Sequence, residues 1–132
     1  MKRQQVHTTP DPYAPYLLSQ AIAACGLLYV SGQAAVGDDG AIVGAGDFDR
    51  QAEQAFRNLQ RALVAGGSSL ERIVKVTIYL TSMRNFSKVV ELRRKWFSPP
   101  YPSDTIVEVS ALYSPDAMIE IDAIALAGDD AS

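Results

Sequence analysis

Residues 99–126 read PPYPSDTIVEVSALYSPDAMIEIDAIAL, and the rest of the chain is organised around them. Two runs, 105–112 and 118–126, alternate in polarity, are rich in β-branched residues and flank a Tyr-Ser-Pro-Asp turn, so they predict a β-hairpin. Alternation along the second run puts Glu120 and Asp122 on one face of the strand, about 6–7 Å apart. Because carboxylates are costly to bury among apolar residues, this face is predicted to be either a solvated rim or a working site.

The elements upstream follow from the same local patterns. Asp47 or Asp49 is a suitable N-cap, an apolar stripe follows at helical spacing, and Gly66 ends that helix. The predicted elements, in order, are strands at 19–24, 27–31 and 41–43, a helix from about 47 to 66, a strand at 73–80 and a helix from about 85 to 97. We expect a single domain over 1–132, with an extended Pro-rich arm at 1–16 and a frayed tail at 128–132.

This element order predicts an α+β fold with one mixed sheet. Right-handed crossovers would put both helices on one face of the sheet. The opposite face then lacks cover from within the chain, although Val107, Val109, Ile119 and Ile121 supply apolar groups to both faces of the hairpin. We therefore expect other copies of the chain to cover the bare face in a closed homo-oligomer.

Composition excludes several classes of protein. The 132 residues carry a net charge of −3 and no basic cluster, which argues against nucleic acid as a partner. A lone Cys25 excludes an internal disulfide and fits a reducing compartment, and a lone His7 leaves no histidine metal cluster. No apolar run reaches the roughly 20 residues that span a bilayer, and the N-terminus lacks the apolar core of a secretory signal. We expect a cytoplasmic protein with no membrane partner.

Six segments in a fixed order resemble one known family. They are LLYVSGQ at 27–33, QAEQAFRNL at 51–59, GGSSL at 66–70, VKVTIYLT at 74–81, VEV at 107–109 and IEIDAIA at 119–125. Together they resemble the RidA/YjgF family, also called L-PSP endoribonuclease-like, over about residues 19–125. The resemblance implies a chorismate-mutase-like fold, assembled as a homotrimer with small-molecule clefts between subunits. It also implies hydrolysis of reactive enamines and imines, such as 2-aminoacrylate, without a metal or organic cofactor.

The chain departs from the family pattern at the position that should hold the substrate. Asp104 falls where family deaminases have an arginine for the substrate carboxylate, and Ile106 and Val90 also replace polar family residues. An anion cannot hold a carboxylate, whereas arginine binds one through two parallel hydrogen bonds. If Asp104 faces the cleft, it predicts a cationic, amine-bearing or neutral ligand; otherwise it is a turn aspartate.

What survives of the family pattern defines the candidate site. Glu120 could organise water or move a proton, and the Ser-Gly pair at 31–32 could present backbone groups to a ligand. Arg93 either replaces the lost cation or extends to solvent from the apolar side of its helix. The candidate residues are Glu120 and Ser31 for catalysis and, for substrate binding, Gly32, Asp104, Tyr16 and Arg93.

Three functional hypotheses follow. The first is a RidA-type hydrolase that acts on an enamine or imine other than 2-aminoacrylate, because Asp104 replaces the family arginine. The second is a non-catalytic trimer that binds a small molecule or regulates another process. The third is an endoribonuclease of the L-PSP type, which the acidic net charge and the single histidine disfavour.

Overall fold

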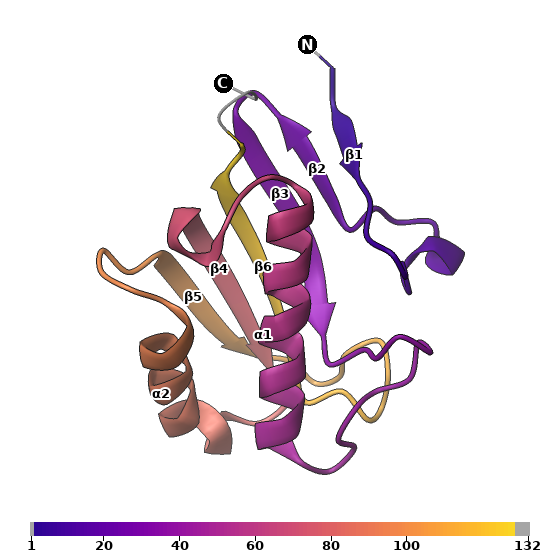
Figure 1. Ribbon diagram of the computed structural model, residues 1–132. Helices are drawn as coiled ribbons and strands as arrows, with labels where there is room; N and C mark the ends of the chain where they lie inside the picture. Colours follow the sequence, from indigo (N-terminus) through magenta and orange to yellow (C-terminus); the bar gives the residue numbers. More distant parts are fainter. Residues whose placement is uncertain (1, 129–132) are drawn as a thin grey trace.

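The computed structural model describes residues 2–128, so the predicted tail at 129–132 lies outside the described residues (Figure 1). Six strands form one mixed sheet in the order β1-β2-β3-β6-β4-β5. The strands are β1 (Gln4–Val6), β2 (Ala21–Ala24), β3 (Leu27–Ala34), β4 (Ile73–Leu80), β5 (Ser103–Glu108) and β6 (Ile119–Leu126). The helices are α1 (Phe48–Ala65) and α2 (Phe86–Trp96), with short 3-10 turns η1 (Ala14–Tyr16), η2 (Leu70–Arg72) and η3 (Met83–Asn85).

Helix α1 begins and ends where its sequence predicts. The Asp47 side chain accepts a hydrogen bond from the Arg50 N–H at 3.2 Å, which satisfies one free donor of the first turn. At the other end, the Gly66 N–H reaches the carbonyls of Ala62 and Leu63. Gly67 follows at a φ of +76°, a left-handed conformation that glycine adopts without strain.

The predicted hairpin is wrong. Strand β6 lies between β3 and β4 and is antiparallel to both, whereas β5 runs parallel to β4 at the sheet edge. The crossover through α2 brings β5 beside β4, as parallel neighbours require. β6 can then hydrogen-bond on both sides, which a two-stranded hairpin would not allow.

Two smaller expectations also need correction. The strand expected at 41–43 is reduced to one bridge between Val36 and Ile42. The arm at 1–16 is not simply extended, because it contributes the edge strand β1 and the turn η1. Its Pro-rich sequence does exclude an α-helix, but Gln4–Val6 can still pair with β2.

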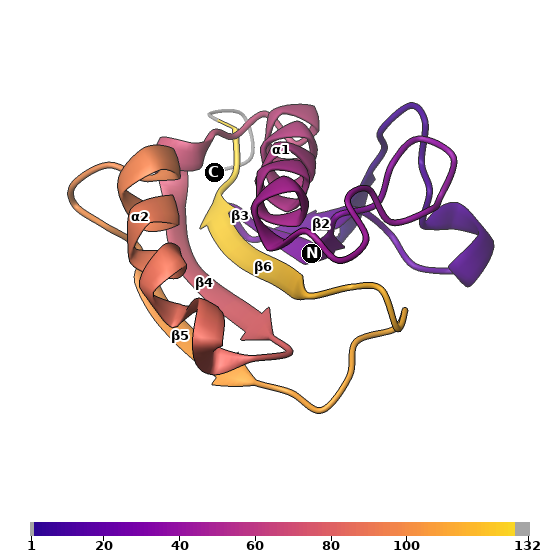
Figure 2. The ribbon, with the colours of Figure 1, turned by 90° about the horizontal axis from the view of Figure 1, so that it is seen from below.

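Both helices cover the same face of the sheet, as predicted (Figure 2). Under them, β6 buries Ile119, Ile121, Ala123 and Ala125, each at most 3% exposed. The opposite face, which we call the open face, carries Glu120, Asp122, Ile124 and Leu126 of the same strand. Within residues 2–128, neither helix is long and apolar enough to cross a membrane.

Candidate functional site

Glu120 lies on the open face, near the start of the strand that runs through the middle of the sheet. Its register partners are Ala34 on β3 and Tyr79 on β4, so the backbone is paired on both sides. The side chain is half-buried, and burial is the main cause that raises its pKa above the ordinary value. The neighbouring Asp122 carboxylate raises the pKa further. The Tyr79 hydroxyl donates to Asp122 at 2.8 Å, which engages that carboxylate in a separate contact.

A bulge in β3 supports the Glu120 side chain. Val30 lies opposite Ala123 and Gln33 lies opposite Ile121, so two residues of β3 face one residue of β6 between these pairs. This irregularity falls at Ser31 and Gly32, and such bulges redirect the chain locally. A Cβ at Gly32 would lie 2.7 Å from the Glu120 Cδ, inside van der Waals contact. The glycine is therefore what lets the carboxyl group pack against the bulge.

Hydrogen bonds to the arm and to the segment just after it hold the bulge in place. The Tyr13 hydroxyl donates to the Gly32 carbonyl at 2.7 Å and accepts from the Ala34 N–H at 3.4 Å. The Ser31 hydroxyl donates to the Ser19 carbonyl at 2.6 Å. With its proton committed to this carbonyl, Ser31 can offer a ligand its oxygen lone pairs as acceptors.

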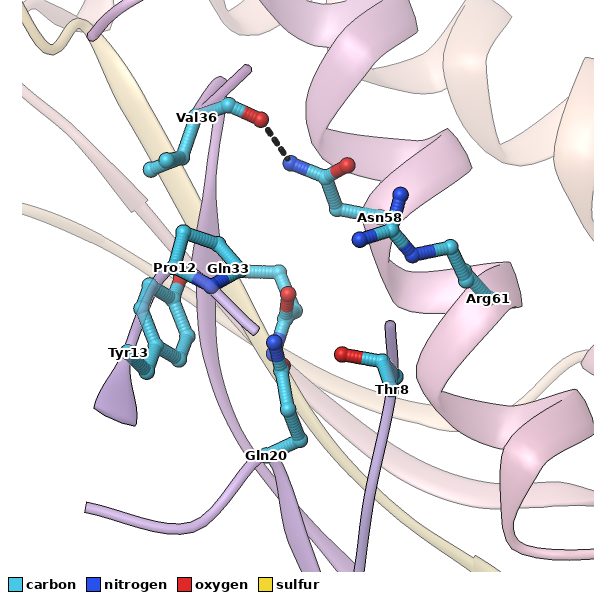
Figure 3. Close-up of a pocket in the computed structure, with 8 residues that line it drawn as sticks. All are labelled: Thr8, Pro12, Tyr13, Gln20, Gln33, Val36, Asn58 and Arg61. Atoms are coloured by element: carbon cyan, nitrogen blue, oxygen red, sulfur yellow. Dashed lines mark hydrogen bonds between the residues drawn. The ribbon is translucent and has the colours of Figure 1, made fainter. Parts of the chain in front are cut away.

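A polar contact layer joins the arm to α1 behind this bulge. Thr8, Pro12 and Tyr13 of the arm face Asn58 and Arg61 of the helix across a cavity of about 10 Å³ (Figure 3). The Asn58 amide donates to the Val36 carbonyl at 2.8 Å, and Gln33 donates to Gln20 at 3.1 Å between them. A cavity of this size holds at most about one water, so it is a structural junction and not a ligand pocket.

A larger pocket opens in front of Glu120, with a volume of about 450 Å³. Tyr16 of the arm and Tyr113 of the loop between β5 and β6 meet there in an edge-to-face pair, with ring centroids 6.5 Å apart. Burial, Tyr16 and Glu120 together raise the pKa of Tyr113. The residues that line the pocket are Pro12, Tyr13, Tyr16, Leu18, Ser31, Gly32, Val36, Gly40, Tyr113 and Glu120.

Asp104 and Arg93 lie together, but on the other face of the sheet. Asp104 pairs in register with Val76, whose side chain is buried under the helices, so the Asp104 side chain points to the helix side. There the Arg93 guanidinium of α2 donates to both carboxylate oxygens, at 2.8 and 3.1 Å. The two side chains neutralise each other, and neither lines the Glu120 pocket of its own chain.

The structure thus divides the six candidate residues into two groups. Glu120, Ser31, Gly32 and Tyr16 share one pocket, whereas Asp104 and Arg93 form an ion pair elsewhere. Leu18 and Tyr113 also line the pocket, as do Tyr13, Pro12, Val36 and Gly40, although none of these was predicted as a site residue. Leu18 and Tyr113 share one signal in the sequence, an apolar or aromatic side chain inside a turn-forming segment. Tyr13, in contrast, is buried in a small cluster with Ala34 and Val36.

Comparison with known proteins agrees with this geometry. The model of the family described as Endoribonuclease L-PSP matches residues 6–127. A RutC family protein of Pyrococcus horikoshii is 39% identical over 88% of this chain and 90% of its own length. The mouse protein named 2-iminobutanoate/2-iminopropanoate deaminase is 32% identical over 96% of this chain and 93% of its own.

The solved structures include one with the same fold throughout. A Rid family protein of Yersinia pestis superposes with a TM-score of 0.88 at 35% identity, covering 95% of this chain and 99% of its own. The resemblance read from the six sequence segments is confirmed. On the family model, these relatives and this shared sheet, the chain belongs to the Endoribonuclease L-PSP family, together with the RutC and Rid proteins.

Proposed function

We propose that this protein is a RidA-type hydrolase of a reactive enamine or imine other than 2-aminoacrylate. One observation carries the proposal: the half-buried Glu120 carboxyl packs against the Ser31–Gly32 bulge inside a pocket of about 450 Å³. Such a pocket is large enough for a small metabolite, with a proton-transfer group placed inside it. The mouse relative named as an imine deaminase supports the same reaction class.

The reaction asks little of the protein because an imine carbon is already electrophilic. A water oxygen bonds to the imine carbon while the nitrogen takes up a proton, and the C–N bond then breaks to leave a carbonyl and ammonia. Glu120 takes the proton from the water and returns it to the leaving nitrogen. Its raised pKa brings the acid and base forms closer in free energy, which suits both halves of this transfer.

We further propose that the working unit is a homotrimer with its ligand clefts between subunits. The open face leaves Tyr29 44% and Leu126 45% exposed, with Ile124 half-buried between them. This apolar row is what a second copy could cover. Glu120 and Asp104 lie on opposite faces of one sheet, so they can share a cleft only if two chains meet. A monomer by light scattering at micromolar concentration would remove this part of the proposal.

We propose that the protein is cytoplasmic. The sequence holds a single cysteine, so the chain has no internal disulfide that would call for an oxidising compartment. A fluorescent fusion in the native host, read against compartment markers, tests this assignment.

The direct test is hydrolysis. Imines are generated in situ from a panel of amines and amino acids by oxidases, and their decay is followed with and without the protein. The proposal expects faster decay with wild type and loss of the acceleration in Glu120→Gln, with 2-aminoacrylate a poor substrate. If no imine decays faster than in buffer between pH 6 and 9, roughly the range in which the general acid and base operate, the proposed activity is wrong.

A non-catalytic binding trimer is the second candidate, and the ion pair at Asp104 favours it. With Arg93 engaged by Asp104, the position that resembles the family's carboxylate site carries no net charge. The variant Arg93→Gln/Asp104→Arg places one free cation there. A gain of 2-aminoacrylate hydrolysis would indicate an intact catalytic cleft, whereas ligand-induced thermal shifts without turnover in any variant would favour binding alone.

The family's ribonuclease name gives the third candidate. A nuclease must attract a polyanion, yet this chain has a net charge of −3. Preparations with and without a contaminant-nuclease inhibitor, assayed on single-stranded RNA across a salt series, test it. Cleavage that resists the inhibitor and weakens with salt would support it over the hydrolase.

A further inference from the structure

The Glu120 pocket has two chemically distinct parts. Ser31, Gly32 and Glu120 supply the polar part, which comes from the two central strands. The apolar part comes from turns: Tyr16 is the last residue of the arm, and Tyr113 belongs to the loop between β5 and β6. Leu18 lines the same wall. A ligand that fits both parts needs a reactive group at one end and an apolar body at the other.

The aromatic residues of this wall are left unusually open. Tyr16 is 65% exposed and Tyr113 54% exposed, although the two rings already contact each other edge to face. Neither ring is buried in the core of its own chain, so packing within one chain does not explain its placement. Paired rings with free faces offer a ready surface for a third planar or apolar group.

The size of the pocket also favours a ligand with a bulky apolar or aromatic body. At about 30 Å³ per water, a volume of 450 Å³ corresponds to about 15 water molecules. A three-carbon imino acid would leave most of this space to water. A ligand with an aromatic-sized substituent would displace that water and cover the exposed rings.

The charges of the pocket disfavour a carboxylate on the ligand. Among the residues of one chain that line it, Glu120 carries the one carboxyl group and none is a cation. Arg93, the candidate replacement for the family arginine, is neutralised by Asp104. An anionic ligand would meet the Glu120 carboxylate without a partner, whereas a protonated imine would be attracted to it and to the faces of the tyrosines.

We propose that this pocket selects imines that carry a bulky apolar or aromatic substituent and no carboxylate, with Tyr16 and Tyr113 as the residues that set this preference. The inference rests on the proposed hydrolase function, and it narrows the substrate class to imines derived from hydrophobic amines. The reaction balances with water alone: the imine of a primary amine and one water give an aldehyde and ammonia.

Four imines test the two features of the proposed substrate class, the bulky apolar substituent and the absence of a carboxylate. An amine oxidase supplies the imines of phenethylamine and ethylamine, and an amino-acid oxidase supplies those of phenylalanine and alanine. We expect kcat/KM for the phenethylamine imine to exceed that for the ethylamine imine by about tenfold or more, since apolar pockets discriminate by such factors. We expect the two carboxylated imines to be the poorer member of each matched pair.

Variants assign the preference to the aromatic wall. Tyr113→Ala and Tyr16→Ala should each lower the preference for the larger imine by about fivefold, the scale of one aromatic contact. Tyr101→Ala is the matched control, because Tyr101 is also 54% exposed but lies outside the pocket, and it should keep the wild-type preference. Equal rates for large and small imines, faster turnover of the carboxylated ones, or no change in either tyrosine variant would overturn the inference.

A binding measurement separates this inference from the hydrolase proposal. Phenethylamine, ethylamine and phenylalanine are titrated into the full chain, and the thermal midpoint is recorded. If phenethylamine alone raises the midpoint, and does so less in Tyr113→Ala, the ligand class stands even if no imine is hydrolysed. If imines are hydrolysed but phenethylamine produces no shift and small imines react best, the hydrolase stands and the ligand class falls.

Discussion

Reversing the charge of Asp104 should destabilise the fold, and reversing Arg93 together with it should restore most of the loss. The Arg93 guanidinium holds both oxygens of Asp104, and the two side chains are only 26% and 15% exposed. The pair joins α2 to the edge strand β5, which has a single neighbour in the sheet. The free energy of unfolding should therefore report the pair directly.

The magnitude follows from burial. Exposed ion pairs contribute about 0–1 kcal/mol, whereas breaking a buried pair costs about 3–5 kcal/mol. This pair lies nearer the buried limit, so we expect Asp104→Arg to lower the free energy of unfolding by about 3 kcal/mol. The double variant Arg93→Asp/Asp104→Arg again has opposite charges in contact, and a coupling of about 2 kcal/mol should return.

Urea unfolding followed by circular dichroism, at one fixed protein concentration, measures these values. Arg94→Asp is the matched control, because Arg94 is the next residue of α2 and its partner Glu91 is exposed. This control should change stability little. If Asp104→Arg unfolds within about 0.5 kcal/mol of wild type, or if the double variant equals the sum of the single ones within that error, the pair does not stabilise the α2–β5 contact.

Three further substitutions test the Glu120 pocket. Gly32→Ala should push the Glu120 carboxyl out of its place, costing about 1–3 kcal/mol by urea unfolding and abolishing imine turnover; wild-type activity would contradict the packing argument. Tyr13→Phe removes the hydroxyl that donates to the Gly32 carbonyl and should cost about 1–3 kcal/mol, with an unchanged thermal midpoint as the contrary result. Because the pKa of Glu120 is raised in the fold, the folded state holds its proton more tightly and stability falls as the pH rises from the ordinary value of 4.5 through the folded value. Glu120→Gln lacks this fall and should gain stability relative to wild type as the pH rises above the ordinary value of 4.5; a constant difference across the pH series would contradict it.

Local sequence patterns predicted the elements whose signals are local. The alternation of 73–80 gave the limits of β4, because every second residue of that run is buried under the helices from Val76 onward. The cap at Asp47 and the stop at Gly66 placed α1. These features depend on neighbours within one turn or one strand, so sequence spacing is enough to find them.

Strand pairing could not be predicted in the same way. Two alternating runs around a Pro-Asp turn satisfy every local requirement of a hairpin, yet β5 and β6 are not neighbours in the sheet. Alternation defines which face a side chain takes and leaves the partner strand open. Alternation therefore predicted the faces of Glu120 and Asp122 correctly, although the predicted pairing was wrong.

For a related reason, only some of the residues that line the pocket could be predicted from the sequence. Glu120 lies on a strand, where alternation indicated its face, and the Ser-Gly pair at 31–32 was indicated by the resemblance to the RidA/YjgF family. Tyr113 lies in a loop, and its partner Tyr16 is distant along the chain. Contacts between turns carry no periodicity, so the aromatic wall emerges only when the sheet brings both segments to one end.

This division between strands and loops has a consequence for specificity. Glu120 is carried by a strand that is hydrogen-bonded on both sides, and Tyr13 fixes the bulge against which it packs. The carboxyl group is thus held by backbone pairing that few substitutions can alter without unfolding the sheet. Tyr16 and Tyr113, in contrast, are more than half exposed on turns, where substitutions cost little stability. The same proton-transfer group can therefore be kept while the aromatic wall changes, so substrate choice should vary at these two positions without loss of the fold.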